Sequence, residues 1–189
     1  TTSGVVTPVG AGLGTVPAGS SFGVDFNPVP DRFRIVSDFD VNLRGNPNTG
    51  LLAANDTTLA YDAADPAAGL DPNVIACAYD RNFPGATQTT LFGIDSSTDA
   101  LVRQGSPNGA PSSPNAGLLF TIGALGVDTG PAAGFDVTTF GGAFAVLNRP
   151  GAGSELYTID LTTGAATLRG AIGGATAVVD LALECPRPL

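Results

Sequence analysis

The chain has 189 residues, of which 43% are hydrophobic and 13% charged, with 26 Gly and 15 Pro. This many breakers disfavours long helices, and the length predicts one domain over residues 1–189. The formal net charge is -9, and the eight basic residues are all Arg. Nucleic acid and anionic membranes are therefore not expected as partners, because no basic patch is available to neutralise phosphates.

The absence of Met predicts that an upstream segment is removed from the primary translation product. Signal-peptide cleavage is the favoured interpretation, and a longer propeptide or a trimmed chain is the alternative. The sequence has no apolar run of transmembrane length. We therefore expect a secreted, extracellular or cell-surface protein that is not inserted into a membrane.

Cys77 and Cys185 are the only two cysteines, and their spacing does not resemble that of metal ligands. In an exported protein this favours a single disulfide that closes a long loop and stabilises the fold by about 4 kcal/mol. Two buried thiols are the alternative, since free cysteine is also a common core residue.

Two segments repeat the same pattern of alternating apolar residues, a polar turn and a second alternating stretch. Residues 91–105 read LFGIDSSTDALVRQG, and residues 156–170 read LYTIDLTTGAATLRG. This pattern predicts two β-hairpins. Asp95 and Asp160 precede the turns, and we expect each carboxylate to accept turn N–H groups.

A second repeated element is the short strand GVDF at residues 23–26, which recurs as GFDV at 134–137 and more loosely as VVDL at 178–181. The first two copies precede further predicted strands, at 31–38 and 141–148. Short antiparallel strands repeated in this way predict an all-β, β-propeller-like array of sheet blades, and a plain sandwich is the competing fold. Residues 55–73 and 106–117 are expected to be surface loops with no core to bury.

The two ends of the chain resemble fragments of one unit. TTSGVVTPVG at residues 1–10 aligns with LTTGAATLRG at 161–170, so the chain begins in the middle of a hairpin, while 176–183 form a lone opening strand. The array is thus expected to hold about three full units and a split terminal unit. The two fragments either meet in a closed ring or leave edges that pair with another chain.

The chain also resembles a bacterial domain-of-unknown-function family numbered 4394, whose members look like secreted or surface propeller-like proteins. The resemblance rests on residues 22–50, FGVDFNPVPDRFRIVSDFDVNLRGNPNTG, and continues through 59–63, 71–83, 89–104 and 122–129. Family members generally carry a further blade at the front, which is missing here, so the resemblance does not imply a closed ring. It implies no activity either.

The residue inventory argues against an enzyme. Without His or Lys, the chain cannot build His-based triads, the usual zinc ligand sets, P-loops or Schiff bases. A carboxylate pair is the remaining catalytic possibility, either Asp38 with Asp40 or Asp25 with Asp136. Turn and strand-end capping is the favoured interpretation of these aspartates.

Calcium is the one cofactor that the sequence suggests, and otherwise none is expected. Asp38, Asp40 and Asn42 alternate along one predicted strand face and offer the oxygen ligands that Ca²⁺ prefers. The EF-hand glycine and glutamate are missing, so solvent-facing strand residues are the alternative.

Together these features predict an extracellular structural subunit that self-associates into oligomers or filaments. The N-terminal segment would pair with a neighbouring copy, with Val5, Val6 and Val9 setting the register. The alternative function is a monomeric extracellular binding module for a small ligand, a glycan or calcium.

Overall fold

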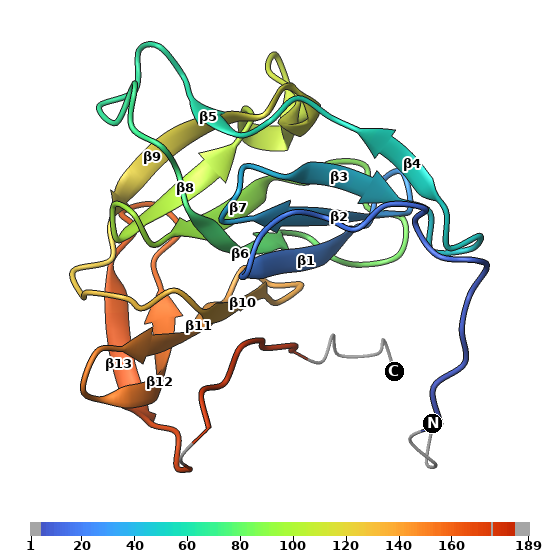
Figure 1. Cartoon of the computed structure of the whole chain (residues 1–189). Coiled ribbons are helices and arrows are strands. Elements are labelled where there is room, and N and C mark those ends of the chain that lie inside the picture. Colours follow the sequence, from blue (N-terminus) through green and yellow to red (C-terminus); the bar gives the residue numbers. More distant parts are fainter. Residues whose placement is uncertain (1–4, 175, 184–189) are drawn as a thin grey trace.

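The computed structural model describes residues 5–174 and 176–183. Within them the chain is all-β, as predicted, and its strands form three mainly antiparallel sheets (Figure 1). The first sheet is a four-stranded meander in the order β1-β2-β3-β4, built from β1 (Phe22–Asn27), β2 (Arg32–Ser37), β3 (Asn42–Gly45) and β4 (Leu52–Asn55).

The other two sheets repeat this plan. The second contains β6 (Val74–Tyr79), β7 (Leu91–Asp95), β8 (Ala100–Gln104) and β9 (Leu118–Ala124), with the short β5 (Ala60–Tyr61) added parallel to β9. The third contains β10 (Ala133–Val137), β11 (Ala143–Arg149), β12 (Gly153–Ile159) and β13 (Ala166–Ala171). Two short 3₁₀ helices in the described chain, Pro107–Gly109 and Pro114–Ala116, precede β9.

Both predicted hairpins are confirmed, as β7 with β8 and β12 with β13. The aspartate before each turn has the expected local role. Asp95 Oδ1 accepts the backbone N–H of Ser97 at 2.7 Å, and Asp160 Oδ1 accepts that of Thr162 at 2.8 Å. These bonds satisfy turn donors that the strand ladder leaves without partners.

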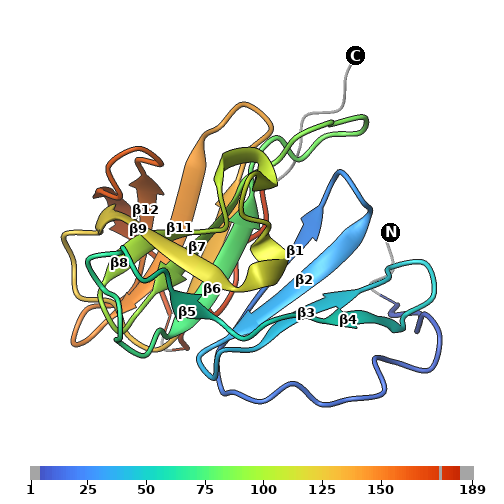
Figure 2. The same ribbon diagram turned by 90° about the horizontal axis from the view of Figure 1, so that it is seen from above.

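The sheets pack against one another through one strand of each, β1, β6 and β10, called here the first strands. Figure 2 shows β6 of the second sheet beside β1 and β2 of the first. One apolar cluster lies between the first and second sheets and includes Val36, Tyr79 and Leu91. A second lies between the second and third sheets and includes Ile75, Phe135 and Tyr157. β6 is therefore covered on both faces, which explains why its sequence VIACAY is continuously buried instead of alternating.

Two glycines allow the first strands to approach closely. A Cβ atom at Gly23 of β1 would lie 2.5 Å from the Cys77 nitrogen of β6, and one at Gly134 of β10 would lie 2.4 Å from the Asp180 carbonyl carbon. The obstructing atoms are backbone, so a side chain at either position would push two elements apart. The glycines of the repeated GVDF and GFDV strands are thus packing requirements.

A buried arginine holds the first and second sheets together. Arg34 of β2 is 1% exposed. Its Nε donates to the Tyr79 hydroxyl at 2.9 Å, Nη1 lies 3.2 Å from Asp56 Oδ2, and Nη2 donates to Asn115 Oδ1 at 2.7 Å. Nη1 also donates to Asn42 Oδ1. The guanidinium thus binds groups from both sheets and from the loop before β9.

The structure contradicts the prediction that residues 55–73 and 106–117 are surface loops with no core to bury. Leu59, Tyr61 and Ala67, within residues 55–73, are buried in or beside the core, and Asn115 from 106–117 closes over Arg34. The expectation that these loops bury nothing is wrong, because isolated apolar side chains among the Asp, Ala and Pro residues still reach the interface between the sheets. The end segments differ as well: residues 5–21 form no strand, and 176–183 lie beside β10 without strand assignment.

Replacing Arg34 by Ala should lower the free energy of unfolding by about 3–5 kcal/mol, because it leaves the Asp56 carboxylate buried without one of its cationic partners. Arg32→Ala is the matched control on the same strand, since Arg32 bonds only to the exposed carbonyls of Pro30 and Asp31. Its effect should stay within about 0.5 kcal/mol. Urea titration measures both, and equal losses would contradict the role given to Arg34.

Replacing Gly23 by Ala should cost about 2 kcal/mol or more, because the added methyl group meets the β6 backbone. Gly173→Ala is the control, since a Cβ atom there meets nothing within 4 Å. The two melting temperatures, compared with that of the parent chain, test this. A Gly23→Ala variant as stable as the control would show that the sheets can separate slightly without loss.

Candidate functional site

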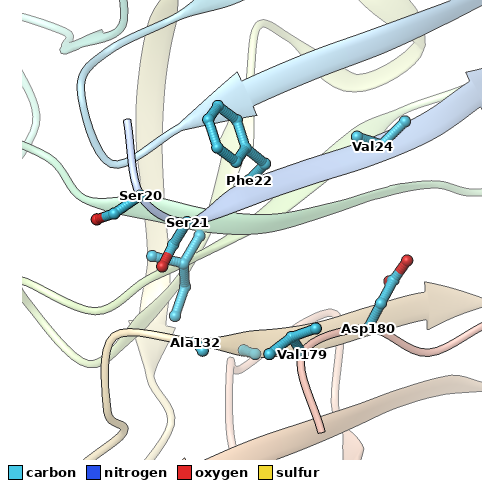
Figure 3. A pocket seen from close by; sticks show the side chains of 9 residues that line it. Ser20, Ser21, Phe22, Val24, Ala132, Val179 and Asp180 are labelled. Carbon is cyan, nitrogen blue, oxygen red and sulfur yellow. The ribbon is translucent and has the colours of Figure 1, made fainter. Parts of the chain in front are cut away.

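The candidate site is a gap between β1 and residues 178–183, which the start of β10 and Ile75 of β6 also border. One cavity of about 350 Å³ is lined by residues that include Phe22, Val24, Val179 and Asp180. A second cavity of about 270 Å³ shares Val24 and Asp180 with it, so both belong to the same gap. Figure 3 shows Phe22 and Val24 on β1, with Val179 and Asp180 across from them.

The repeated Gly-x-Asp pattern places two aspartates in equivalent positions around this gap. Asp25 Oδ1 accepts the N–H of Phe26 at 2.6 Å, and its Oδ2 accepts the N–H of Tyr79 on β6 at 2.6 Å. Asp136 does the same, accepting from Val137 at 2.7 Å and from Leu183 at 2.6 Å. Asp25 therefore joins β1 to β6, and Asp136 joins β10 to the C-terminal segment at residues 178–183.

Asp180 is a third copy of this arrangement, with its Oδ1 accepting the N–H of Leu181 at 2.8 Å. The three aspartates satisfy N–H groups on the inner edges of the first strands, which have no ladder partner on that side. β6 differs, because Ala76 occupies the equivalent position, three residues before Tyr79. The Asp shared by GVDF, GFDV and VVDL is the sequence signal for this arrangement. The repeat alone does not indicate that these carboxylates bond between sheets.

Burial, and after it the charges of neighbouring carboxylates, raise the pKa of Asp25 and of Asp136. Burial raises the pKa of Asp25 to about 7, against the opposing effect of its two backbone N–H bonds, and the charges of Asp136 and Asp180 raise it further. The pKa of Asp136 is raised for the same main reason, its burial. Because all four oxygens of Asp25 and Asp136 bind backbone, the geometry of this pair favours strand capping over glycoside hydrolysis.

The residues considered for calcium are not arranged as expected. Asp38 and Asp40 lie in the turn between β2 and β3, and only Asn42 lies on a strand, so the expected alternation along one strand face is wrong. Asp38 accepts the Ser20 N–H at 2.9 Å and the Ser20 hydroxyl at 2.6 Å. Asn42 is 1% exposed, and its Oδ1 accepts from Arg34 and from Gln104, the latter at 3.0 Å.

Asp40 adopts a left-handed backbone with φ of 57°. Its Oδ1 is buried and accepts no hydrogen bond from the described residues. Burial first, and then the nearby Asp71 carboxyl group, raise the pKa of Asp40 to about 6. Within residues 5–174 and 176–183, no group of three or more acidic, His or Cys side chains is arranged to hold a metal ion. Calcium binding stays a prediction.

The remaining predicted residues lie apart from the gap. Cys77 lies buried on β6, where burial raises the pKa of its thiol. Cys185 lies outside the described residues, so the disulfide stays a prediction. Val5, Val6 and Val9 are 72%, 88% and 51% exposed. They lie on an extended stretch before β1, at the edge of the molecule.

The stability of the fold should fall as pH rises from about 4 to 7, because Asp25 keeps its proton up to about pH 7 when folded but only to about 3.8 when unfolded. Folding takes up a proton between these values, so the gain is complete below pH 3.8 and is lost through pH 7. We expect a loss on the order of 1 kcal/mol, reduced by solvent in the gap.

Asp25→Asn should flatten this pH dependence, whereas Asp128→Asn, at an exposed residue between β9 and β10, should leave it unchanged. Melting temperatures measured at intervals of half a pH unit provide the test. An Asp25→Asn chain that still loses as much stability as the parent would assign the dependence to Asp40 and Asp136 instead.

Comparison with known proteins places the chain in a family without assigning an activity. No curated protein and no solved structure matches it. Within the described part of the chain, no helix has the length and apolar character needed to cross a bilayer. The model of one family, described as a domain of unknown function (DUF4394), matches residues 1–182. The chain therefore belongs to the DUF4394 family, as the resemblance of residues 22–50 had indicated.

Proposed function

We propose that this protein is a non-enzymatic, extracellular structural subunit that self-associates through its N-terminal segment. The observation that carries the proposal is the exposure of Val5, Val6 and Val9 along a stretch without strand assignment. Complete burial of a valine side chain contributes about 1.5–3 kcal/mol, so three of them can hold one copy to another. Donated strands use such side chains for register and backbone hydrogen bonds for affinity.

The root of this segment is attached to the first sheet. A Cβ atom at Gly10 would lie 1.9 Å from the Thr49 carbonyl oxygen, so the backbone passes close to the turn before β4. Further along, the Ser37 hydroxyl donates to the Ala18 carbonyl at 2.8 Å. The segment thus lies along the first sheet of its own copy at Gly10 and Ala18, and in this proposal the exposed side chains of Val6 and Val9 are the ones offered to another copy.

Deleting residues 1–10 should abolish assembly and leave a folded monomer. Light scattering after size-exclusion chromatography would give the mass, and negative-stain microscopy would show filaments, sheets or single particles. A finer variant replaces Val5, Val6 and Val9 by Ser. Its matched control replaces Leu70 and Phe140, which are 57% and 85% exposed, by Ser. Assembly that survives the valine changes would show that this segment does not hold the copies together.

The second candidate function is a monomeric binding module, favoured by the cavity of about 350 Å³ between β1 and residues 178–183. Its size lies within the range of small-molecule sites. Calcium should then raise the melting temperature of a monomer, with a shift that grows with its concentration. A polymer whose melting is indifferent to calcium and to chelator would favour the structural role.

A further inference from the structure

We propose that the N-terminal segment of a second copy binds in the gap between β1 and residues 178–183, as an added strand beside the first strands of the sheets. This inference rests on the proposed function and names the receiving surface that it requires. Four observations support it: an apolar face on β1, a junction that the chain cannot form with itself, an aspartate directed into the gap, and the size of the exposed patch.

The first observation is the apolar face of β1. Phe22, Val24 and Phe26 are 38%, 49% and 50% exposed, and they alternate along the strand, so they share one face. The opposite face carries Gly23 and Asp25, which contact β6. Exposed apolar residues grouped on one strand face mark an interaction site more strongly than scattered ones.

The second observation is that β1 cannot donate a backbone N–H to Asp180 in the way that β6 donates one to Asp25. Asp25 and Asp136 each accept the N–H of one residue on the following strand, Tyr79 and Leu183. Tyr79 and Leu183 each lie three residues after the position that corresponds to Asp25 in their own segment. In β1 the residue three positions after Asp25 is Pro28, which has no N–H. Residues 178–183 therefore cannot join β1 in the way that β6 joins it.

The close approach of the backbones is also missing at this junction. Gly23 and Gly134 make room for the next strand, whereas Val178 occupies the corresponding position two residues before Asp180. A valine side chain there keeps a following strand at a greater distance. The gap between β1 and residues 178–183 is therefore a consequence of Pro28 and Val178, and it is wide enough to form the two cavities.

The third observation is the direction of Asp180, which points from residues 178–183 into the gap in Figure 3. Within the described residues it accepts one backbone N–H, that of Leu181, whereas Asp25 and Asp136 each accept two. An extended strand entering the gap would supply the second N–H. The preferred occupant is thus a polypeptide backbone, which offers such donors at regular spacing.

The fourth observation is the size of the patch. Three half-exposed side chains provide on the order of 200 Å² of apolar surface, given about 150–250 Å² for a whole aromatic side chain. A stable face-to-face dimer needs about 800 Å² from each partner, so the patch suits one strand and not a whole sheet. The exposed stretch from Val5 to Val9 is one residue shorter than the six-residue β1.

The side chains of this stretch also match the two walls of the gap. In an extended strand, Val5, Thr7 and Val9 point to one side, and Val6 and Pro8 point to the other. The first group would cover Phe22, Val24 and Phe26, and Val6 would face Val179. Val6 and Val179 are 88% and 63% exposed, so both have surface to lose on binding.

Disulfide trapping between two differently substituted copies tests this placement. One chain carries Val6→Cys and a mass tag, the other carries Val24→Cys, and both carry Cys185→Ser, while the buried Cys77 is retained. The control partner carries Phe140→Cys, at a site 85% exposed and away from the gap. After mild oxidation of the mixture, we expect at least ten times more tagged heterodimer with Val24→Cys than with Phe140→Cys.

Failure of this inference and failure of the proposed function give different results. Equal trapping at both positions, in a protein that assembles and loses assembly on deletion of residues 1–10, would overturn the receiving site alone. A parent chain that is monomeric at all concentrations would overturn both. Val24→Asp gives a second readout: it should abolish assembly with an unchanged circular dichroism spectrum, whereas Phe140→Asp should assemble normally, and a Val24→Asp chain that assembles would contradict the site.

Discussion

The contact between the first strands of successive sheets is the constraint on which the rest of this structure depends. Inner-edge N–H groups of these strands have no ladder partner, and burying them unpaired would cost about 1–3 kcal/mol each. Asp25 and Asp136 solve this by accepting two such groups apiece, while Gly23 and Gly134 let the backbones approach. A short motif thus fixes both the spacing and the order of the sheets.

Polar groups supply specificity elsewhere between the sheets as well. Arg34 directs its guanidinium at partners from two sheets and a loop, an arrangement that apolar side chains could not specify. The same network occupies Asn42, which removes it from the oxygen ligands available to a cation. Residues whose sequence pattern suggests a binding site can therefore be engaged in hydrogen bonds inside the protein instead.

The sequence predicted the strands and hairpins because alternation and turn residues are local signals. It also found the repeated GVDF and GFDV strands, but the bonds from Asp25 to Tyr79 and from Asp136 to Leu183 join residues 54 and 47 positions apart. Such contacts have no local pattern. For the same reason the burial of Leu59 and Tyr61 escaped prediction, and Asp38 and Asp40 were assigned to a strand that in fact ends at Ser37.

Ala76 on β6 gives the three junctions unequal chemistry. At the middle one, between β6 and β10, no carboxylate of the described residues bridges the two strands as Asp25 bridges β1 and β6, and apolar contacts such as those of Ile75 and Phe135 pack the second and third sheets together. Ionisation of Asp25 and Asp136 therefore weakens the two outer junctions, β1 with β6 and β10 with residues 178–183. In alkaline solution the first sheet and the C-terminal segment would detach first. The second and third sheets would stay together longer, because the contact between β6 and β10 does not depend on a carboxyl group that loses its proton.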